Sequence, residues 1–516
     1  MSATDPNQPT LVSRNRPLML VGVMMAMVLQ TLDGTIANVA LPYMKPSLGA
    51  TQDTITWVLT SYVLASAVAM PLAGWLVDKI GIRNLIILSV VLFTLASMLC
   101  GAAQTLNEMV LFRVLQGLAG AFLSPLAQTV ILDSSTPAER PRMMAMYVQG
   151  ALLGPIMGPI IGGFLTENYN WRWVFYVNLP LGMISLLLLL AFMPHTPRRH
   201  RPVDLPGWLY VSAALCSIQL LLDRGETVDW FSSGEIVIYA VIAVSGLWLS
   251  VVHLATARAP LFPVQLFRDP NFVVGVIFSF LVGLVVYATM ALLPGLLQLI
   301  YGYPAIDAGL LLAPRGVGMF FSIVLFGRYM DKFDPRLVAG FGLMTTAVSV
   351  MLMTRWTVDM PTWPILSSGL MQGVGLAFMF MPLNLIAFST LPASVRTDGS
   401  SLISLSRSLG SSFGVAATSV LLARSVQVNH AEIGASITRL SVPLDVDRIG
   451  AFGNAGEAVF RVADIMVNRQ AVMIAYLNDF KAIALACIVA TPFLLLVRVN
   501  RTGAAAPPVP PADVGH

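Results

Sequence analysis

Long apolar runs separated by short polar gaps are the feature that most limits how this chain can fold. A run of about 20 apolar residues can cross a bilayer as a helix, and we find fourteen such runs between residues 18 and 498. Only 11% of the residues are charged, against about 25% in soluble globular proteins. The sequence therefore predicts an all-α polytopic membrane protein with about fourteen spans.

Lys and Arg are divided unevenly between the two sets of loops. With the N-terminus placed in the cytoplasm, seventeen fall on that side, and the short outer loops hold only Lys45, Arg172, Arg224 and Arg355. Because positive residues are retained in the cytoplasm, we expect both termini there. The first apolar run is too long for a signal peptide. The basic residues gather on no single domain, so the net charge of +4 does not indicate nucleic-acid binding.

Two similar turns indicate an internal duplication. "GWLVDKIGIRN" (Gly74–Asn84) follows the second run and "GRYMDKFDPRL" (Gly327–Leu337) follows the tenth. We expect two six-span halves with two extra spans inserted between them, and a binding site near mid-membrane where the halves meet. The expected segments are an N-terminal tail (1–17), a first bundle (18–194), a linker (195–204), two extra spans (205–255), the first five spans of the second bundle (256–423), an outer segment (424–475), the last span (476–498) and a cytoplasmic tail (499–516).

The outer segment 424–475 contains one stretch with a helical pattern, "NAGEAVFRVADIMVNRQAVM". Asn454 and Glu457 have the spacing of a helix cap, and Val459, Val462 and Met466 share one helical face. The pattern predicts an amphipathic helix in a periplasmic loop. Such a helix could lie on the membrane surface or dock on a partner protein.

The motifs and residues that the sequence lacks limit the possible energy sources for transport. A nucleotide-binding P-loop needs Gly-Lys followed by Ser or Thr, and none of the four lysines follows a glycine. No histidine lies in the middle of an apolar run, so any proton carrier is expected to be a carboxylate. Cys100, Cys216 and Cys487 lie in separate runs without metal-ligand spacing. We expect no metal, no cofactor and no enzyme activity.

Four charged residues lie deep in the predicted spans, namely Asp33, Arg113, Arg315 and Arg407. A charge in lipid is costly, so such residues face a cavity or a partner. Asp33 is the only acid among them and is the candidate for proton or substrate coupling, since burial and a nearby guanidinium act on a carboxylate in opposite directions. Arg113 cannot release its proton, so it would tune a carboxylate or hold an anionic substrate. A static Asp–Arg pair that only locks helices together is the alternative.

The fifth span carries "GALLGPIMGPIIGG", in which glycines recur every fourth residue beside two prolines. Small residues at this spacing allow close helix contact, and each proline removes a backbone donor. Ordinary helix packing would account for the glycines alone, whereas the doubled Gly-Pro favours a helix that both seals and flexes. The residues concerned are Gly150, Gly154, Pro155, Gly158, Pro159 and Gly162.

Together these motifs resemble those of the major facilitator superfamily. "LDGTIANVALP", "GWLVDKIGIR" and "RVLQGLAGAF" are similar to its first-span, loop 2–3 and fourth-span motifs, and the fifth-span pattern resembles the signature of its drug–proton antiporters. Fourteen spans resemble the EmrB/QacA branch. The resemblance implies a multidrug–proton antiporter of a bacterial inner membrane, working with a periplasmic adaptor of the EmrA type and an outer-membrane channel.

The resemblance also implies roles for individual residues. Asp33 would carry the proton or a cationic substrate, with Arg113 as its coupling arginine. Gly74, Asp78 and Arg83 would form a cytoplasmic gating turn, with Asp133 as a candidate partner of Arg83. The second-half turn would use Gly327, Asp331 and Arg336, but it has Asp334-Pro335 where the first has Gly81-Ile82.

The substrate class stays open between two readings. Export of varied amphipathic or cationic drugs is the first. A proton-driven transporter of one dedicated metabolite, such as a siderophore or a lipid, would share every motif.

Overall fold

The computed structural model describes residues 11–196, 198, 201–225, 227–326, 333–436 and 454–496. Fourteen helical segments in this part of the chain are long and apolar enough to span a membrane, which confirms the predicted fold class. Five of these spans combine two or more helical elements, and the secondary structure described is helical throughout. We call the side with the 193–204 linker the inner side, because the basic loops predict that it faces the cytoplasm.

The first six spans form one bundle. Its helices are α1 (Arg16–Ser47), α2 (Gln52–Ile55), α3 (Trp57–Ala69), η1 (Met70–Leu72), α4 (Ala73–Ile80), α5 (Ile82–Ala102), α6 (Leu106–Gly120), α7 (Leu123–Asp133), α8 (Arg140–Asn168), α9 (Trp173–Tyr176) and α10 (Asn178–Phe192). The second span is α3–η1–α4 and the fourth is α6–α7.

The last six spans form the second bundle. It contains α13 (Val264–Arg268), α14 (Pro270–Leu299), α15 (Ala305–Phe326), α16 (Pro335–Met353), α17 (Trp363–Ser389), η4 (Ala393–Val395), α18 (Arg396–Ser436), α20 (Asn454–Ala490) and η5 (Thr491–Leu496). In each bundle the first and fifth spans pack closely through glycine. Gly154 of α8 lies against Thr31 of α1, and Gly283 of α14 lies against Arg407 of α18. This shared arrangement fits the predicted duplication.

The two extra spans, α11 (Leu205–Arg224) and α12 (Gly234–Thr256), pack on each other with η2 (Trp230–Ser232) in the loop between them. Trp208 of α11 donates a hydrogen bond to the Val68 carbonyl of α3 at 2.8 Å, and α11 also contacts α18. The pair therefore lies beside the seam between the bundles. Most side chains of α12 stay exposed, as expected for a helix that faces lipid.

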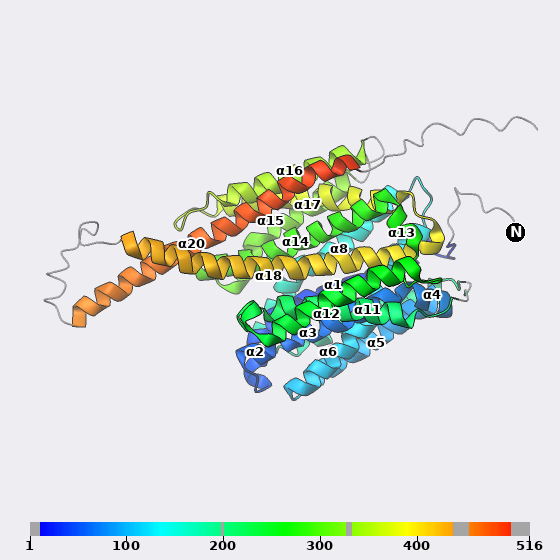
Figure 1. Cartoon of the computed structure of the whole chain (residues 1–516), viewed down its shortest axis with the longest axis horizontal. Coiled ribbons are helices and arrows are strands. Elements are labelled where there is room, and N and C mark those ends of the chain that lie inside the picture. The colour runs from blue at the N-terminus through cyan, green and yellow to red at the C-terminus, as the bar shows by residue number, and fades with distance from the viewer. Residues whose placement is uncertain are drawn as a thin grey trace, which may run out of the picture.

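The thirteenth and fourteenth spans extend well beyond the bundle, and Figure 1 shows the ends of α18 and α20 projecting together at the left. α18 has 41 residues and is thus about 60 Å long, twice the bilayer hydrocarbon thickness of about 30 Å. Beyond the bundle the two helices contact each other, for example between His430 and Asp464 at 3.1 Å. We call this part the outer hairpin, residues 420–436 and 454–475.

The outer hairpin differs from the predicted loop 424–475. α18 continues as helix to Ser436, and α20 runs without a break from Asn454 into the last span, so the expected boundary at 475/476 falls inside a helix. A continuous α20 has no bend at which residues 454–475 could turn to lie on the membrane surface. The two segments remain helical in water because each packs on the other, which a count of apolar residues does not detect.

Candidate functional site

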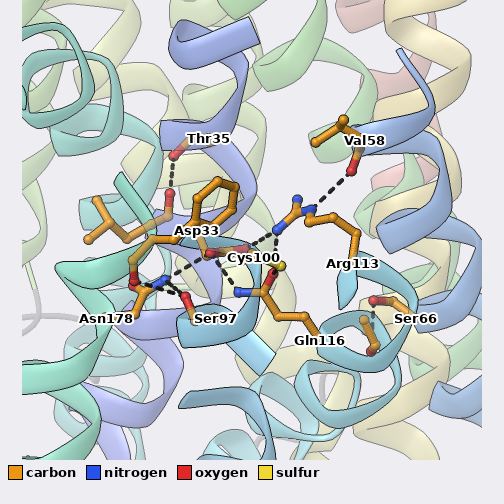
Figure 2. Close-up of polar contacts among 12 residues, drawn as sticks. Asp33, Thr35, Val58, Ser66, Ser97, Cys100, Arg113, Gln116 and Asn178 are labelled. Carbon is orange, nitrogen blue, oxygen red and sulfur yellow. Dashed lines mark hydrogen bonds and ion pairs between the residues drawn. The ribbon is translucent and has the colours of Figure 1, made fainter. Parts of the chain in front are cut away.

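Asp33 of α1 and Arg113 of α6 form a fully buried ion pair (Figure 2). Arg113 Nη1 donates to Asp33 Oδ2 at 2.6 Å, and the exposed fraction of both side chains is 0%. The other carboxylate oxygen, Oδ1, accepts hydrogen bonds from Gln116 Nε2 and Asn178 Nδ2, each at 2.8 Å. The carboxylate of α1 is thus held by side chains of α6 and α10.

The guanidinium of Arg113 is fixed by several further groups. Its Nε donates to the Val58 carbonyl at 2.9 Å and its Nη1 to Gln116 Oε1 at 2.6 Å. The ring centroids of Tyr62 and Phe175 lie 4.4 and 5.7 Å from its Cζ, within the range of cation–π attraction. The charge of Arg113 is therefore balanced by one carboxylate and by aromatic faces.

Some buried polar atoms around the pair have no hydrogen-bond partner in the described part of the chain. They are Arg113 Nη2, Tyr62 Oη and Asn178 Oδ1. Buried polar atoms are normally hydrogen-bonded. These three atoms can therefore bind a water molecule or a polar group of a substrate beside the carboxylate.

Sequence reasoning missed two residues of this site, Gln116 and Asn178. Gln116 follows Arg113 by three residues and so lies on the same helical face. Asn178 is also buried, and its Nδ2 donates to Ser97 Oγ at 2.9 Å. The available signal was an amide side chain within an apolar run, because such a group needs partners in a membrane.

The fifth-span glycines pack directly against the stretch of α1 that carries Asp33. A Cβ atom at Gly154 would lie 2.4 Å from the backbone carbon of Thr31, and one at Gly158 would lie 2.2 Å from Thr35 Oγ1. Thr35 Oγ1 donates to the Gly154 carbonyl at 3.0 Å. α8 is one helix through both Pro155 and Pro159. A displacement of α8 would therefore be passed to α1 on either side of Asp33.

Gly74 of the first turn meets the second bundle at the inner side, and Asp78 meets the linker. A Cβ atom at Gly74 would lie 2.0 Å from Asp398 Oδ1 of α18, so a larger residue does not fit there. Arg201 of the linker lies between two carboxylates, at 3.1 Å from Asp398 and 3.8 Å from Asp78. Arg201 and Asp398 were not among the expected gating residues.

The expected partnership of Arg83 with Asp133 is wrong. Arg83 donates from Nη2 to the Leu190 carbonyl at 2.9 Å and lies beside the His195 ring. Asp133 instead accepts from Arg396 Nη1 of α18 at 2.6 Å. Asp133 ends α7, where the bundles face each other, whereas Arg83 begins α5 and faces α10. The Asp133–Arg396 pair therefore joins the two halves.

Only part of the second-half turn can be placed. Gly327 and Asp331 lie outside the described residues. Asp334 accepts a hydrogen bond from the Arg336 backbone at 3.0 Å and caps α16, with Pro335 in its first turn. The first turn instead ends α4 at Gly81, which has φ +87°. The two turns therefore use different helix signals.

The remaining deep arginines, Arg315 and Arg407, have no acid within ion-pair distance in the described chain. Arg315 Nη2 lies 3.5 Å from the Val286 carbonyl. Arg407 Nη2 lies 3.4 Å from Ser124 Oγ of the first bundle, and its guanidinium faces the Phe380 ring at 5.5 Å. Arg407 is thus at the seam between the halves, and Arg315 is inside the second bundle.

Besides Asp33, the described spans contain further buried acids. Asp479 of α20 has an exposed fraction of 0%, and neither carboxylate oxygen has a hydrogen-bond partner in the described chain. It is the fourth residue of the predicted span 476–498, and no sequence pattern singled it out. Because α20 begins at Asn454, Asp479 lies well inside the helix.

Outside the spans, one carboxylate is tied to the start of α1. Arg16 Nη1 donates to both Glu139 oxygen atoms at 2.9 Å. This hydrogen bond lowers the pKa of Glu139 to about 2, so Glu139 is negative at neutral pH. The described residues include no group of three or more His, Cys, Asp or Glu that could hold a metal ion.

Curated relatives match most of the chain. The chain is 34% identical to the multidrug export protein EmrB of Escherichia coli (strain K12) over 428 residues, which is 81% of this chain and 83% of that protein. It is 35% identical to the fatty acid resistance protein FarB of Neisseria gonorrhoeae over 422 residues, 81% of this chain and 83% of FarB.

Solved structures share the fold at low identity. The proton:xylose symporter XylE superposes with a TM-score of 0.62 at 14% identity, over 93% of this chain and 94% of XylE. A bacterial homolog of the human lysosomal transporter Spinster superposes with a TM-score of 0.55 at 17% identity, over 94% of this chain and 99% of that protein. The family model of the Major Facilitator Superfamily matches residues 23–415. This chain therefore belongs to the major facilitator superfamily of transporters.

Proposed function

We propose that the protein is a multidrug exporter of a bacterial inner membrane that moves amphipathic or cationic compounds outward in exchange for protons. The observation that carries the proposal is the buried Asp33–Arg113 pair, a carboxylate and a fixed cation in the middle of a membrane bundle. Relatives named for multidrug export, such as EmrB of Escherichia coli, support the substrate class.

The proposed coupling uses the two states of the Asp33 carboxyl. When Asp33 is charged, the ion pair and the bonds from Gln116 and Asn178 hold α1 to α6 and α10. A proton on the carboxylate removes its charge and weakens the hold on Arg113, because hydrogen bonds between charged groups are about twice as strong as neutral ones. α1 is then free to move with α8, which it meets at Gly154 and Gly158.

Alternation between open states also requires the inner contacts between the bundles to break. In this conformation Asp133 pairs with Arg396, and Arg201 with Asp398, on the inner side. Deeper in the seam, Gln128 donates to Asn384 at 2.9 Å. We propose that these polar contacts form the inner gate, with Gly74 allowing α18 to approach and Asp78 helping to hold Arg201.

We further propose that the outer hairpin docks a periplasmic adaptor of the EmrA type, which leads to an outer-membrane channel. Val462, Ile465 and Met466 on α20 have exposed fractions of 56, 65 and 65%. They point away from the contact between the two helices, because Val467 and Ala471 on the other face of α20 are buried. An exposed apolar group of this kind favours a protein partner.

A dedicated metabolite remains the alternative substrate. The specific observation in its favour is the similarity to FarB, a relative named for fatty acid resistance. A lipid-like substrate would use the same Asp33 chemistry.

The test is transport in inside-out vesicles with an imposed pH gradient. We expect a lipophilic cationic dye to accumulate, accumulation to vanish with a protonophore, and Asp33→Asn to abolish it at equal protein level. Asp307→Asn changes an exposed acid at the start of α15 and serves as the matched control with full transport. Dye accumulation that does not depend on the pH gradient would refute proton coupling. Full transport by Asp33→Asn would refute the proposal that Asp33 carries the proton.

A further inference from the structure

A pocket of about 600 Å³ lies apart from the Asp33 site, between α1, α8 and α10. It extends from the inner end of α1 at Arg16 to about mid-span at Val28. Its volume is in the range of sites that bind small molecules, about 300–1,000 Å³. We call it the α1/α8 pocket.

The pocket forms where the glycine contact between α1 and α8 ends. Gly154 and Gly158 bring the two backbones together, whereas at Gly150 the neighbours are side-chain ends. A Cβ atom there would lie 2.3 Å from Met24 Cε and 2.6 Å from Met27 Cε. Towards the inner side the helices are thus separated by methionine side chains rather than by direct backbone contact.

Flexible apolar side chains line the pocket. Met24, Met25, Met143 and Met146 contribute four of them, and methionine adapts its shape to varied ligands. Met146 and Leu153 have exposed fractions of 38 and 44%. Because these apolar side chains are exposed within spans, the pocket opens on the lipid-facing side of the bundle.

The inner end of the pocket carries a net positive charge. Arg16 is paired with Glu139, as described above. Arg142 also lines the pocket and is exposed, and no ion pair to it occurs in the described chain. Basic residues at the inner end of a span attract anionic headgroups, whereas a cationic amphiphile would be repelled.

We propose that the α1/α8 pocket binds a single-chain anionic amphiphile taken from the inner leaflet, with its headgroup at Arg142 and its chain among the methionines. This inference rests on the proposed export function in its alternative form, with a lipid-like substrate, and names the class and the route of entry of that substrate; a cationic drug would enter by another route. Val28 precedes Asp33 by five residues on α1, about 7.5 Å along the helix. A bound chain therefore contacts both helices whose movement the proposed coupling requires.

Photolabelling of the full chain in zwitterionic lipid nanodiscs tests the proposal, with a diazirine-bearing palmitic acid as the probe. We expect labelled peptides to contain Met24 or Met146. Arg142→Gln should weaken labelling about tenfold, equivalent to about 1.4 kcal/mol, and Leu153→Trp should reduce it by filling the pocket. Arg198→Gln in the exposed linker and Leu187→Trp on an exposed face of α10 are the matched controls and should label normally.

Competition distinguishes the sources of the anionic group. Competition by palmitate but not by phosphatidylglycerol would support a single-chain ligand with a free carboxylate. Equal competition by phosphatidylglycerol, a two-chain anionic lipid, would overturn the single-chain assignment. Labelling that is unchanged in Arg142→Gln, or that dodecyltrimethylammonium competes away equally well, would overturn the proposal. Dye export by the unsubstituted protein is measured in parallel. Absence of dye export would refute the proposed export function but would not refute binding in the pocket.

Discussion

Neutralising only one member of the Asp33–Arg113 pair should be more harmful than neutralising both. Both side chains have an exposed fraction of 0%, and Arg113 has no other acid within ion-pair distance in the described residues. Asp33→Asn leaves a buried guanidinium without a counter-charge, a loss of about 3–5 kcal/mol in measured pairs. The double variant Asp33→Asn/Arg113→Gln removes both charges and keeps amides that can bond to Gln116 and Asn178. It should therefore unfold at a higher temperature than Asp33→Asn alone.

Thermal unfolding of the purified variants in detergent measures the order of stability, and dye export in vesicles measures function. If Asp33 carries protons, the double variant stays inactive although its stability recovers. If the pair only locks helices, the double variant regains export, and the proposed coupling role is wrong. If the Asp33→Asn variant is as stable as the parent, the argument that each buried charge is stabilised by the other is wrong.

Three other substitutions test separate parts of the fold. Gly154→Ala should lower the free energy of unfolding by about 1–3 kcal/mol and lower the transport of all substrates together in vesicles. Gly163→Ala should be tolerated, because there is open space at the Cβ position of Gly163. Loss of transport of a single drug would instead indicate that Gly154 has a role in binding. Asp133→Asn should loosen the inner gate and speed maleimide labelling of a cysteine introduced at the buried Ser400 in inside-out vesicles, and unchanged labelling would contradict that role. Asp479→Leu removes an unpaired buried carboxyl, a group that costs about 1–3 kcal/mol, so its unfolding temperature should match or exceed the parent's; a drop would indicate that Asp479 has a partner outside the described residues.

The spans could be predicted because hydropathy is a local property of each segment. Fourteen runs of apolar residues became fourteen helical spans, and a charge inside an apolar run was enough to select Asp33 and Arg113. Contacts between distant segments were harder. Asp133 and Arg396 are 263 positions apart, and nothing local in "LDSS" distinguishes Arg396 from Arg83 as a partner.

The helix expected to start at Asn454 is present as α20. The continuation of α18 to Ser436 and the unbroken passage of α20 into the last span were not predicted, for a different physical reason. Apolar content identifies only the part of a helix that lies in lipid, whereas α18 and α20 continue into water by packing on each other. The predicted last span therefore began at residue 476, 22 residues after the start of the helix that contains it, and Asp479 was not named among the candidate residues. Gln116 and Asn178 were missed because only formal charges were considered, although a buried amide also needs partners.

The continuous α18 connects the inner side of the transporter mechanically to the outer hairpin. One helix runs from Arg396 and Asp398 at the proposed inner gate, past Arg407 at the seam, to Ser436 in the outer hairpin. Over a length of about 60 Å, a tilt of about 10° at one end displaces the other by about 10 Å. A protein bound at the end of the outer hairpin would therefore be displaced each time the gate opens. Because coupling between two sites acts in both directions, binding of that protein could also keep the gate closed.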